Sequence, residues 1–249
     1  KKNAPKLLEE KLSSKSWKGD IIVFSGNTDC YQPIERKLQI TRRCLEVMMR
    51  WKHPVGIITK NALILRDLEI LKALNELNLI AVNISITSLS EDTRRLLEPR
   101  TASIKKRLEV VKTLSEHNIP VNVMMAPIIP SLNSHEILPL VKQVAALGAR
   151  SVAYTVVRLN GQIGPIFEDW ARKTIPDRAD RILHQIAECH GGQVNDSTWG
   201  RRIKGSGVIS EQIKSTMALA KKKYLPEGGM PTLCADHYLQ LKNPQLGLF

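Results

Sequence analysis

Five short apolar runs, each separated from the next by an amphipathic stretch, limit the possible folds of this chain more than any other feature of its sequence. The runs lie near residues 21–24, 55–59, 81–86, 121–126 and 151–157. Between the first two, residues 40–51 place apolar side chains at the spacing of one helical face. Strands that alternate with helices predict a parallel sheet with helices outside it, so we expect residues 1–158 to form an α/β domain.

The pattern changes after Arg158. Glycines punctuate the rest of the sequence, helical segments are expected near residues 165–174, 178–189 and 210–224, and a polar tail begins at Pro226. We therefore predict that residues 159–249 form a mostly helical C-terminal extension.

The helix expected after the fourth run has recognisable boundary residues. Asn133 and Glu136 stand at N-cap and N3 spacing, which is typical of a capping box. Gly148 is placed to end the same helix as a C-cap.

The composition and net charge indicate where the protein is located and which classes of partner it can bind. The net charge is +13, which favours polyanionic partners, although the basic residues are scattered and also fit a solvated surface. The four cysteines show no CxxC spacing, and no signal peptide or membrane-length apolar segment is visible. These features predict a cytoplasmic protein with reduced thiols and no membrane partner.

Polar side chains follow most of the expected strands. Because ligands of parallel α/β barrels bind at the carboxyl ends of the strands, these residues are the candidate site. They are Ser25 to Asp29, Thr59 and Lys60, Ser85 and Thr87, Pro127 and Pro130, and Val157 and Arg158.

Lys60 is the most informative of these residues. Directly after a strand, its ammonium could bind a carboxylate or form a Schiff base, or it could simply reach solvent from the strand end. Asp29 and Glu35 could serve a metal or act as a base, or they could cap helices and pair with Arg42 or Arg43. Residues 98–100 read as a solvated loop, and no HxH or HxxxH pair suggests a metal site.

Together these segments resemble one branch of the radical S-adenosylmethionine superfamily, which is related to spore photoproduct lyase and is often labelled DNA repair photolyase-like. The likeness runs from about Asn3 to Arg158, and more weakly through residues 196–207. Its motifs are residues 26–35, 41–46, 58–60 with 66–67, 84–87, 97–108 and 126–133.

The resemblance implies a partial (β/α)6 TIM-like barrel. It also implies a [4Fe-4S] cluster held by a CxxxCxxC loop, with S-adenosylmethionine bound at the fourth iron. One-electron cleavage of S-adenosylmethionine then releases a 5′-deoxyadenosyl radical, and the electron comes from a donor such as flavodoxin or ferredoxin.

The sequence departs from this family where the cluster should be bound. It contains no CxxxCxxC, Cys30 and Cys44 are too far apart to replace it, and the first barrel strand is missing. The chain also starts at Lys1 without a methionine. We therefore expect a start in mid-domain, cluster cysteines upstream of Lys1, no metal ligands in this chain, and no activity of this segment alone.

The resemblance assigns roles to particular residues. Ser25, Gly26 and Thr28 would flank the methionine amino group, although the usual Gly-Gly-Glu is absent here. Lys60 would bind the carboxylate, with Ser85 hydrogen-bonding nearby. The remaining assignments are Arg100 or Arg107 as a second anion partner, and Pro127, Ile128 and Val157 around the adenine.

Three functional hypotheses follow. The first is a radical S-adenosylmethionine enzyme, a lyase among the activities of this branch, with nucleic acid as a candidate substrate. The second is a barrel enzyme of another class that uses Lys60 as a Schiff-base lysine. The third is a basic nucleic-acid-binding protein without catalysis, which predicts strongly salt-dependent binding to nucleic acid.

Overall fold

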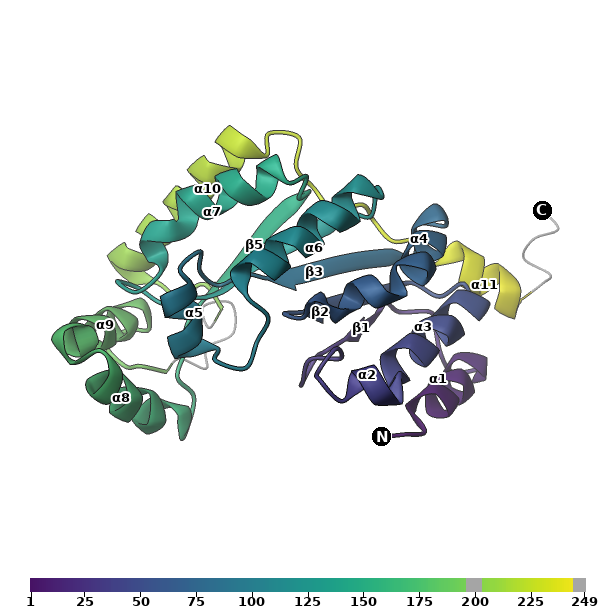
Figure 1. Ribbon diagram of the computed structural model, residues 1–249, viewed down its shortest axis with the longest axis horizontal. Helices are drawn as coiled ribbons and strands as arrows, with labels where there is room; N and C mark the ends of the chain where they lie inside the picture. Colours follow the sequence, from purple (N-terminus) through teal and green to yellow (C-terminus); the bar gives the residue numbers. More distant parts are fainter. Residues whose placement is uncertain (196–202, 244–249) are drawn as a thin grey trace.

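A single parallel sheet forms the centre of the molecule (Figure 1). The computed structural model describes residues 1–195 and 203–243. In this part of the chain the strands pair in chain order, β1-β2-β3-β4-β5. Their bounds are β1 (Ile22–Phe24), β2 (Val55–Thr59), β3 (Ile80–Ser85), β4 (Val121–Ile128) and β5 (Ser151–Val156). The parallel α/β architecture is confirmed, and each strand lies within two residues of its predicted position.

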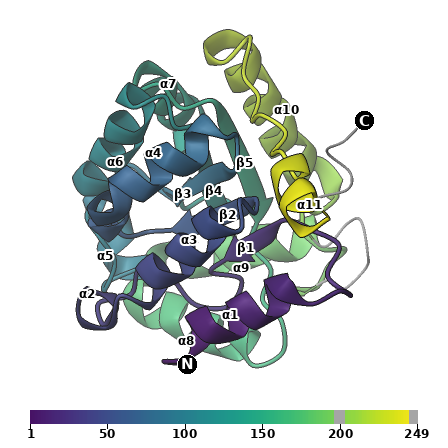
Figure 2. The same ribbon diagram turned by 90° about the vertical axis from the view of Figure 1, so that its right-hand side faces the viewer.

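Helices connect successive strands on one side of the sheet (Figure 2). The elements up to β5 are α1 (Ala4–Ser13), α2 (Glu35–Leu38), α3 (Ile40–Arg50), η1 (Ala62–Asp67), α4 (Leu68–Glu76), α5 (Glu91–Leu97), α6 (Ile104–Glu116), η2 (Ser134–Glu136) and α7 (Ile137–Ala146). Helix α5 could not be predicted from the sequence, because this short helix is polar and has no apolar stripe. Ser90 caps it by accepting a hydrogen bond from the Thr93 amide at 3.2 Å.

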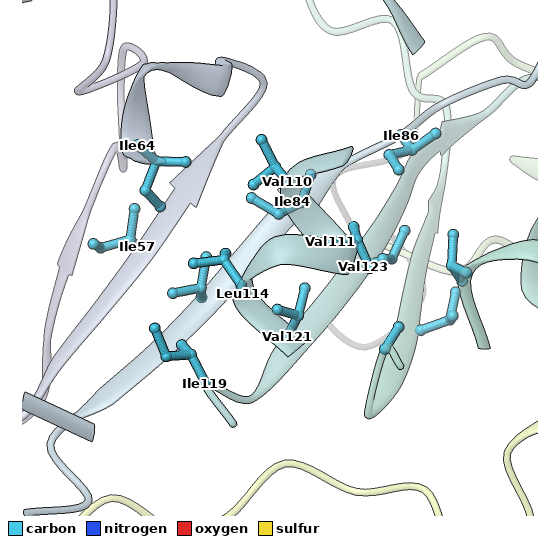
Figure 3. Packing of buried hydrophobic residues seen from close by; sticks show 14 of the residues in the cluster. Ile57, Ile64, Ile84, Ile86, Val110, Val111, Leu114, Ile119, Val121 and Val123 are labelled. Carbon is cyan, nitrogen blue, oxygen red and sulfur yellow. The ribbon is translucent and has the colours of Figure 1, made fainter. Parts of the chain in front are cut away.

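The main core lies between the sheet and these helices. Alternate strand residues point into it, as the two-residue period of a strand requires. Figure 3 shows how β3 and β4 pack against α6 through Ile84, Val121, Val123, Val110, Val111 and Leu114. Each of these side chains is at most 1% exposed, and burial of one such side chain contributes roughly 1.5–3 kcal/mol.

The other face of the sheet carries smaller and more polar side chains. Gly56 pairs with Ala81, and Asn83 pairs with Asn122. The Asn122 amide donates to the Asn83 side-chain oxygen at 2.8 Å, and the Asn83 amide donates to the Ile57 carbonyl at 3.1 Å. This face is therefore suited to polar contacts, in contrast to the face that packs against the helices.

After β5, the described residues up to Asn243 form four helices, one more than the sequence predicted. Its helices are α8 (Ile163–Thr174), α9 (Pro176–Cys189), α10 (Gly207–Tyr224) and α11 (Asp236–Lys242). Helix α10 packs along α7, and α8 and α9 pack on a small core that includes Val157 and Ile129 (Figure 1). The polar tail predicted from Pro226 onward is wrong in part, because it includes α11.

Hydrogen bonds connect helix α11 to helix α1 and to the residue that follows α1. The Tyr238 hydroxyl donates to the Leu12 carbonyl at 2.6 Å, and the Lys242 ammonium donates to the Ser14 carbonyl at 2.7 Å. Sequence periodicity could not reveal this contact because the partners lie more than 200 positions apart.

His53 is fully buried beside this junction and is held in one neutral tautomer. The Trp17 indole donates to its Nε2 at 3.0 Å, so Nδ1 carries the proton and donates to the Pro54 carbonyl at 2.9 Å. Burial lowers the pKa of His53, and this outweighs the opposing effects of the Pro54 carbonyl and Asp20. Protonation of Nε2 would remove the acceptor of the Trp17 hydrogen bond.

We expect this histidine to make the free energy of unfolding depend on pH. Below a pH of about 6.5 the unfolded chain binds this proton while the folded chain resists it, so stability falls as pH falls toward the lowered pKa, by up to ~1.4 kcal/mol per pH unit. Above that pH the contribution is complete. Urea denaturation at pH 7.5 and 5.5 should show a loss that His53→Gln reduces. The matched control, His135→Gln at a largely exposed histidine, should behave as the wild type; an equal loss in all three proteins would contradict the assignment.

Candidate functional site

The loops that follow β1 and β2 are joined by one carboxylate. Asp29 accepts hydrogen bonds from the Thr59 hydroxyl and from the Lys60 amide, both at 2.8 Å. Ser25, with φ of 79°, turns the chain after β1, and its hydroxyl accepts from the Cys30 amide at 2.8 Å. Asp29 is therefore a loop cap in this structure, which is the alternative to a metal ligand or base.

A second carboxylate network fixes the next segment. Glu35 caps α3 by accepting from the Ile40 and Thr41 amides at 2.9 and 3.0 Å, and it pairs with Arg66 at 3.2 Å. Of the alternatives considered for Glu35, helix capping is the one that the structure shows, and Arg42 pairs with Asp67 and Glu69 instead.

Asp67 is the centre of this network. It is fully buried, Arg66 binds it through Nε and Nη2 at 2.8 Å each, and Arg42 and the Tyr31 hydroxyl donate to it at 3.1 Å. Burial, together with the Asp67 charge, raises the pKa of Tyr31 well above its usual range, so the phenol stays a donor. The network fixes the loop after β1 against η1, the helix that follows β2 in the chain.

A chain of charged groups lies across the ends of β2 and β3. The Lys60 ammonium is 2.5 Å from Oε1 of Glu98, and the other oxygen of Glu98 is 2.8 Å from Nη2 of Arg107. Arg107 also donates to the Ser85 carbonyl at 3.0 Å. The structure therefore brings Lys60, Ser85 and Arg107 together, with Glu98 between the two cations.

The members of this chain differ in their access to solvent. The side chains of Arg107, Glu98 and Lys60 are 1%, 9% and 35% exposed. Burial opposes the ionisation of Glu98, but the charges of Arg107 and Lys60 prevail and lower its pKa. An incoming anion would therefore meet Lys60 first.

Glu98 is a central residue of this site that no local sequence pattern indicates. The prediction of a solvated loop at residues 98–100 is wrong for Glu98, although Arg100 is exposed. The only signal in the sequence was that Glu98 stands within a motif of the resemblance, since nothing local shows that the turn after α5 places its side chain over β2.

The other proposed binding residues lie in two places. Gly26 and Thr28 lie in the exposed loop after β1, next to Ser25. Ile128 and Val157 are buried at the ends of β4 and β5, where the Val157 amide donates to the Ile128 carbonyl at 2.8 Å, and Pro127 is half-buried beside them.

Asn133 and Glu136 support this second group and do not form a capping box. The Asn133 amide donates to the Thr87 and Pro127 carbonyls at 2.7 and 3.1 Å, and Glu136 accepts from the Ser88 hydroxyl at 2.8 Å. The prediction fails because both side chains are buried where the loops after β3 and β4 meet, and these loops present unpaired polar groups.

The described residues do not fit an iron–sulfur cluster. No group of three potential metal ligands occurs among residues 1–195 and 203–243. Burial raises the pKa of Cys30 to about 12 and those of Cys44 and Cys189 to about 11, whereas metal ligation requires thiolates.

The length and apolar character of the described helices show whether any of them could cross a membrane. None of those in residues 1–195 and 203–243 combines the length with the apolar character that a bilayer crossing requires. Arg201 and Arg202, which contribute to the basic character of the sequence, lie outside the described residues.

Comparisons with known proteins identify the family of the chain. Residues 4–144, more than half of the chain, match the family model of the Radical SAM superfamily. The matched segment includes the three strands and loops that carry Ser25, Lys60 and Ser85.

Several curated proteins are similar to the chain. An uncharacterized protein of Mycobacterium tuberculosis is 25% identical over 183 residues, which cover 73% of this chain and 54% of that protein. An uncharacterized protein of Methanocaldococcus jannaschii is 33% identical over 132 residues, or 53% of this chain and 48% of that protein. A third, from Acidianus two-tailed virus, is 28% identical over 192 residues, or 73% and 62%. The chain thus spans about half the length of the curated relatives it matches.

Proposed function

This chain belongs to the radical SAM superfamily, and we propose that it forms the part of a radical S-adenosylmethionine enzyme that binds the methionine end of S-adenosylmethionine at Lys60. The observation that carries the proposal is the half-exposed Lys60 ammonium, held at the ends of β2 and β3 beside Ser85. A primary ammonium fixed in this way is a suitable partner for a single carboxylate.

The described residues fit S-adenosylmethionine in several respects. Lys60 would bind the carboxylate, and the Ser85 hydroxyl would add a hydrogen bond. A Cβ placed on Gly26 would meet nothing within 4 Å, so the loop of Ser25, Gly26 and Thr28 offers its backbone to open space. Pro127, which is half-buried, would contact the adenine, and the buried Ile128 and Val157 would support it from within the protein.

S-adenosylmethionine supplies, when it is bound and reduced by one electron, a 5′-deoxyadenosyl radical. The residues of this chain would bind and orient the molecule and keep water from it. The superfamily generally uses a [4Fe-4S] cluster, and the described residues do not hold one. We therefore assign no step of the reaction to a group bound by these residues.

We propose that the cluster cysteines, in a CxxxCxxC loop, lie outside residues 1–249 and follow a strand that pairs with β1. In the described part of the chain β1 pairs with β2 alone, and Ile21 and Val23 at this edge are 51% and 49% exposed. A cavity of about 430 Å³ runs beside the edge and is lined by Leu8, Phe24 and Ile34 among others. An apolar strand edge of this kind is normally covered.

We expect the segment 1–249 to bind no stoichiometric [4Fe-4S] cluster. Its buried thiols are protonated at neutral pH and are carried by separate elements, whereas a cluster needs converging thiolates. Anaerobic reconstitution followed by iron and sulfide analysis measures this. About four irons per chain, lost on Cys30→Ser or Cys44→Ser, would show that the ligands have been misplaced.

The geometry does not favour the Schiff-base alternative. A Schiff-base lysine must present a free amine, whereas Lys60 is ion-paired with Glu98. Borohydride trapping with carbonyl compounds distinguishes the two functions, because only a Schiff-base lysine is modified at Lys60.

The finer features of the function stay predictions. They are membership of the spore photoproduct lyase-like branch, lyase activity, and a flavodoxin or ferredoxin as electron donor. Nucleic acid as the substrate is supported only by the net charge of +13. Binding that falls steeply with salt concentration would support it.

A further inference from the structure

Several hydrogen bonds fix the backbone of the turn that carries Glu98. Its amide donates to the Arg94 carbonyl at 2.7 Å, and its carbonyl accepts from Arg94 Nη1 at 3.1 Å and from the Thr101 hydroxyl at 2.7 Å. Arg94 is itself buried and paired with Glu91 at 2.6 Å. Hydrogen bonds therefore hold both the amide and the carbonyl of Glu98, although the residue lies in a turn.

Arg107 holds the carboxylate of Glu98 and has little capacity for another anion. It is 1% exposed, and it donates to the Ser85 and Ala102 carbonyls, both at 3.0 Å, and to the Thr101 hydroxyl. Through Ser85 the whole arrangement is anchored to β3. Arg107 thus acts as a support for Glu98, and the earlier assignment of Arg107 as an anion partner fits less well than Lys60.

Lys60 has unused capacity for an anion. An ammonium has three N–H donors, and Glu98 is its one acceptor among the described residues. Since the side chain is 35% exposed, a ligand carboxylate can join Lys60 without displacing Glu98. A lysine without such a partner would have to be ordered when the ligand binds, which costs side-chain entropy.

We propose that Glu98 is a positioning residue for Lys60. It fixes the ammonium over the ends of β2 and β3, so that the carboxylate of S-adenosylmethionine meets a preformed partner. This role rests on the proposed function. It explains why a carboxylate that would otherwise compete with the ligand is buried at this place.

A double-mutant cycle tests the role. We compare the wild type with Glu98→Gln, Lys60→Met and the double variant, all in the longer protein that would contain the proposed cluster loop, after reconstitution, and measure S-adenosylmethionine affinity by calorimetry. We expect Glu98→Gln to weaken binding roughly tenfold in the wild type and to have no further effect in Lys60→Met. Decarboxylated S-adenosylmethionine, which lacks the carboxylate, should bind all four proteins alike.

Each other outcome is informative. Glu98→Gln could also weaken binding further in the Lys60→Met background, or weaken the binding of decarboxylated S-adenosylmethionine. Either result would show a general structural effect and overturn the role of Glu98. Tighter binding by Glu98→Gln would show that Glu98 is a competitor. An unchanged affinity of Lys60→Met would overturn the proposed function itself, and the role of Glu98 with it.

Two further variants keep the test sound. Glu98→Asp retains the charge next to Arg107 but is one methylene too short to reach both cations, and it replaces Glu98→Gln if that variant does not fold. It should show the same loss and the same dependence on Lys60. Glu109→Gln changes an exposed glutamate of α6 and should leave binding unchanged.

Discussion

Lys60→Met should weaken the binding of S-adenosylmethionine by about tenfold to a hundredfold. The substitution removes the half-exposed ammonium while it keeps most of the volume of the side chain. Charge-assisted hydrogen bonds contribute roughly 1.5–3 kcal/mol, and each ~1.4 kcal/mol is a factor of ten in affinity. Calorimetric titration of the reconstituted enzyme measures the effect.

The controls distinguish loss of the contact between Lys60 and the ligand carboxylate from loss of the folded structure. Decarboxylated S-adenosylmethionine should bind Lys60→Met and the wild type equally, because it has no carboxylate to lose. Lys105→Met, at an exposed lysine of α6, should bind as the wild type does. Lys60→Arg should restore only part of the affinity, because the planar guanidinium needs more room. Equal affinities of the wild type and Lys60→Met would mean that Lys60 only reaches solvent from its strand end.

Asp67→Ala should lower the free energy of unfolding by about 3–5 kcal/mol. Asp67 is fully buried and accepts hydrogen bonds from Arg66, Arg42 and Tyr31. Without it two guanidinium groups, only 22% and 27% exposed, each lose one of their acceptors, and the buried Tyr31 phenol loses its acceptor among the described residues. Removal of one partner of a buried charge network has a cost of this size. Urea denaturation monitored by circular dichroism provides the measurement.

Glu69→Gln is the matched control for this network. Glu69 also pairs with Arg42, but its side chain is 59% exposed. Exposed ion pairs contribute only ~0–1 kcal/mol, so the variant should lie close to the wild type. If Asp67→Ala cost less than about 1 kcal/mol, the two arginines would have to reach water, and the network would not be a rigid support for the site.

The sequence alone was sufficient to predict the positions of the strands and the parallel α/β architecture. Both follow from local patterns, because an apolar run of four to seven residues with helical periodicity on either side of it favours a strand. Lys60 was identifiable for the same reason, since its place directly after β2 follows from the strand itself. The end of α7 was also local, and Gly148 adopts the left-handed conformation expected of a C-cap, with φ of 88°.

Contacts between distant segments were decided by the tertiary structure. Asn133 and Glu136 have the spacing of a capping box, yet they bind the loops after β3 and β4, because buried polar groups in those loops need partners more than a helix end does. From the sequence, Glu98 is predicted to lie in a polar loop. In the structure, α5 and the turn after it place its carboxylate between Lys60 and Arg107. Local propensity determines which elements form, whereas the partner of a buried charge depends on which chain segments the packed core brings within about 3 Å of it.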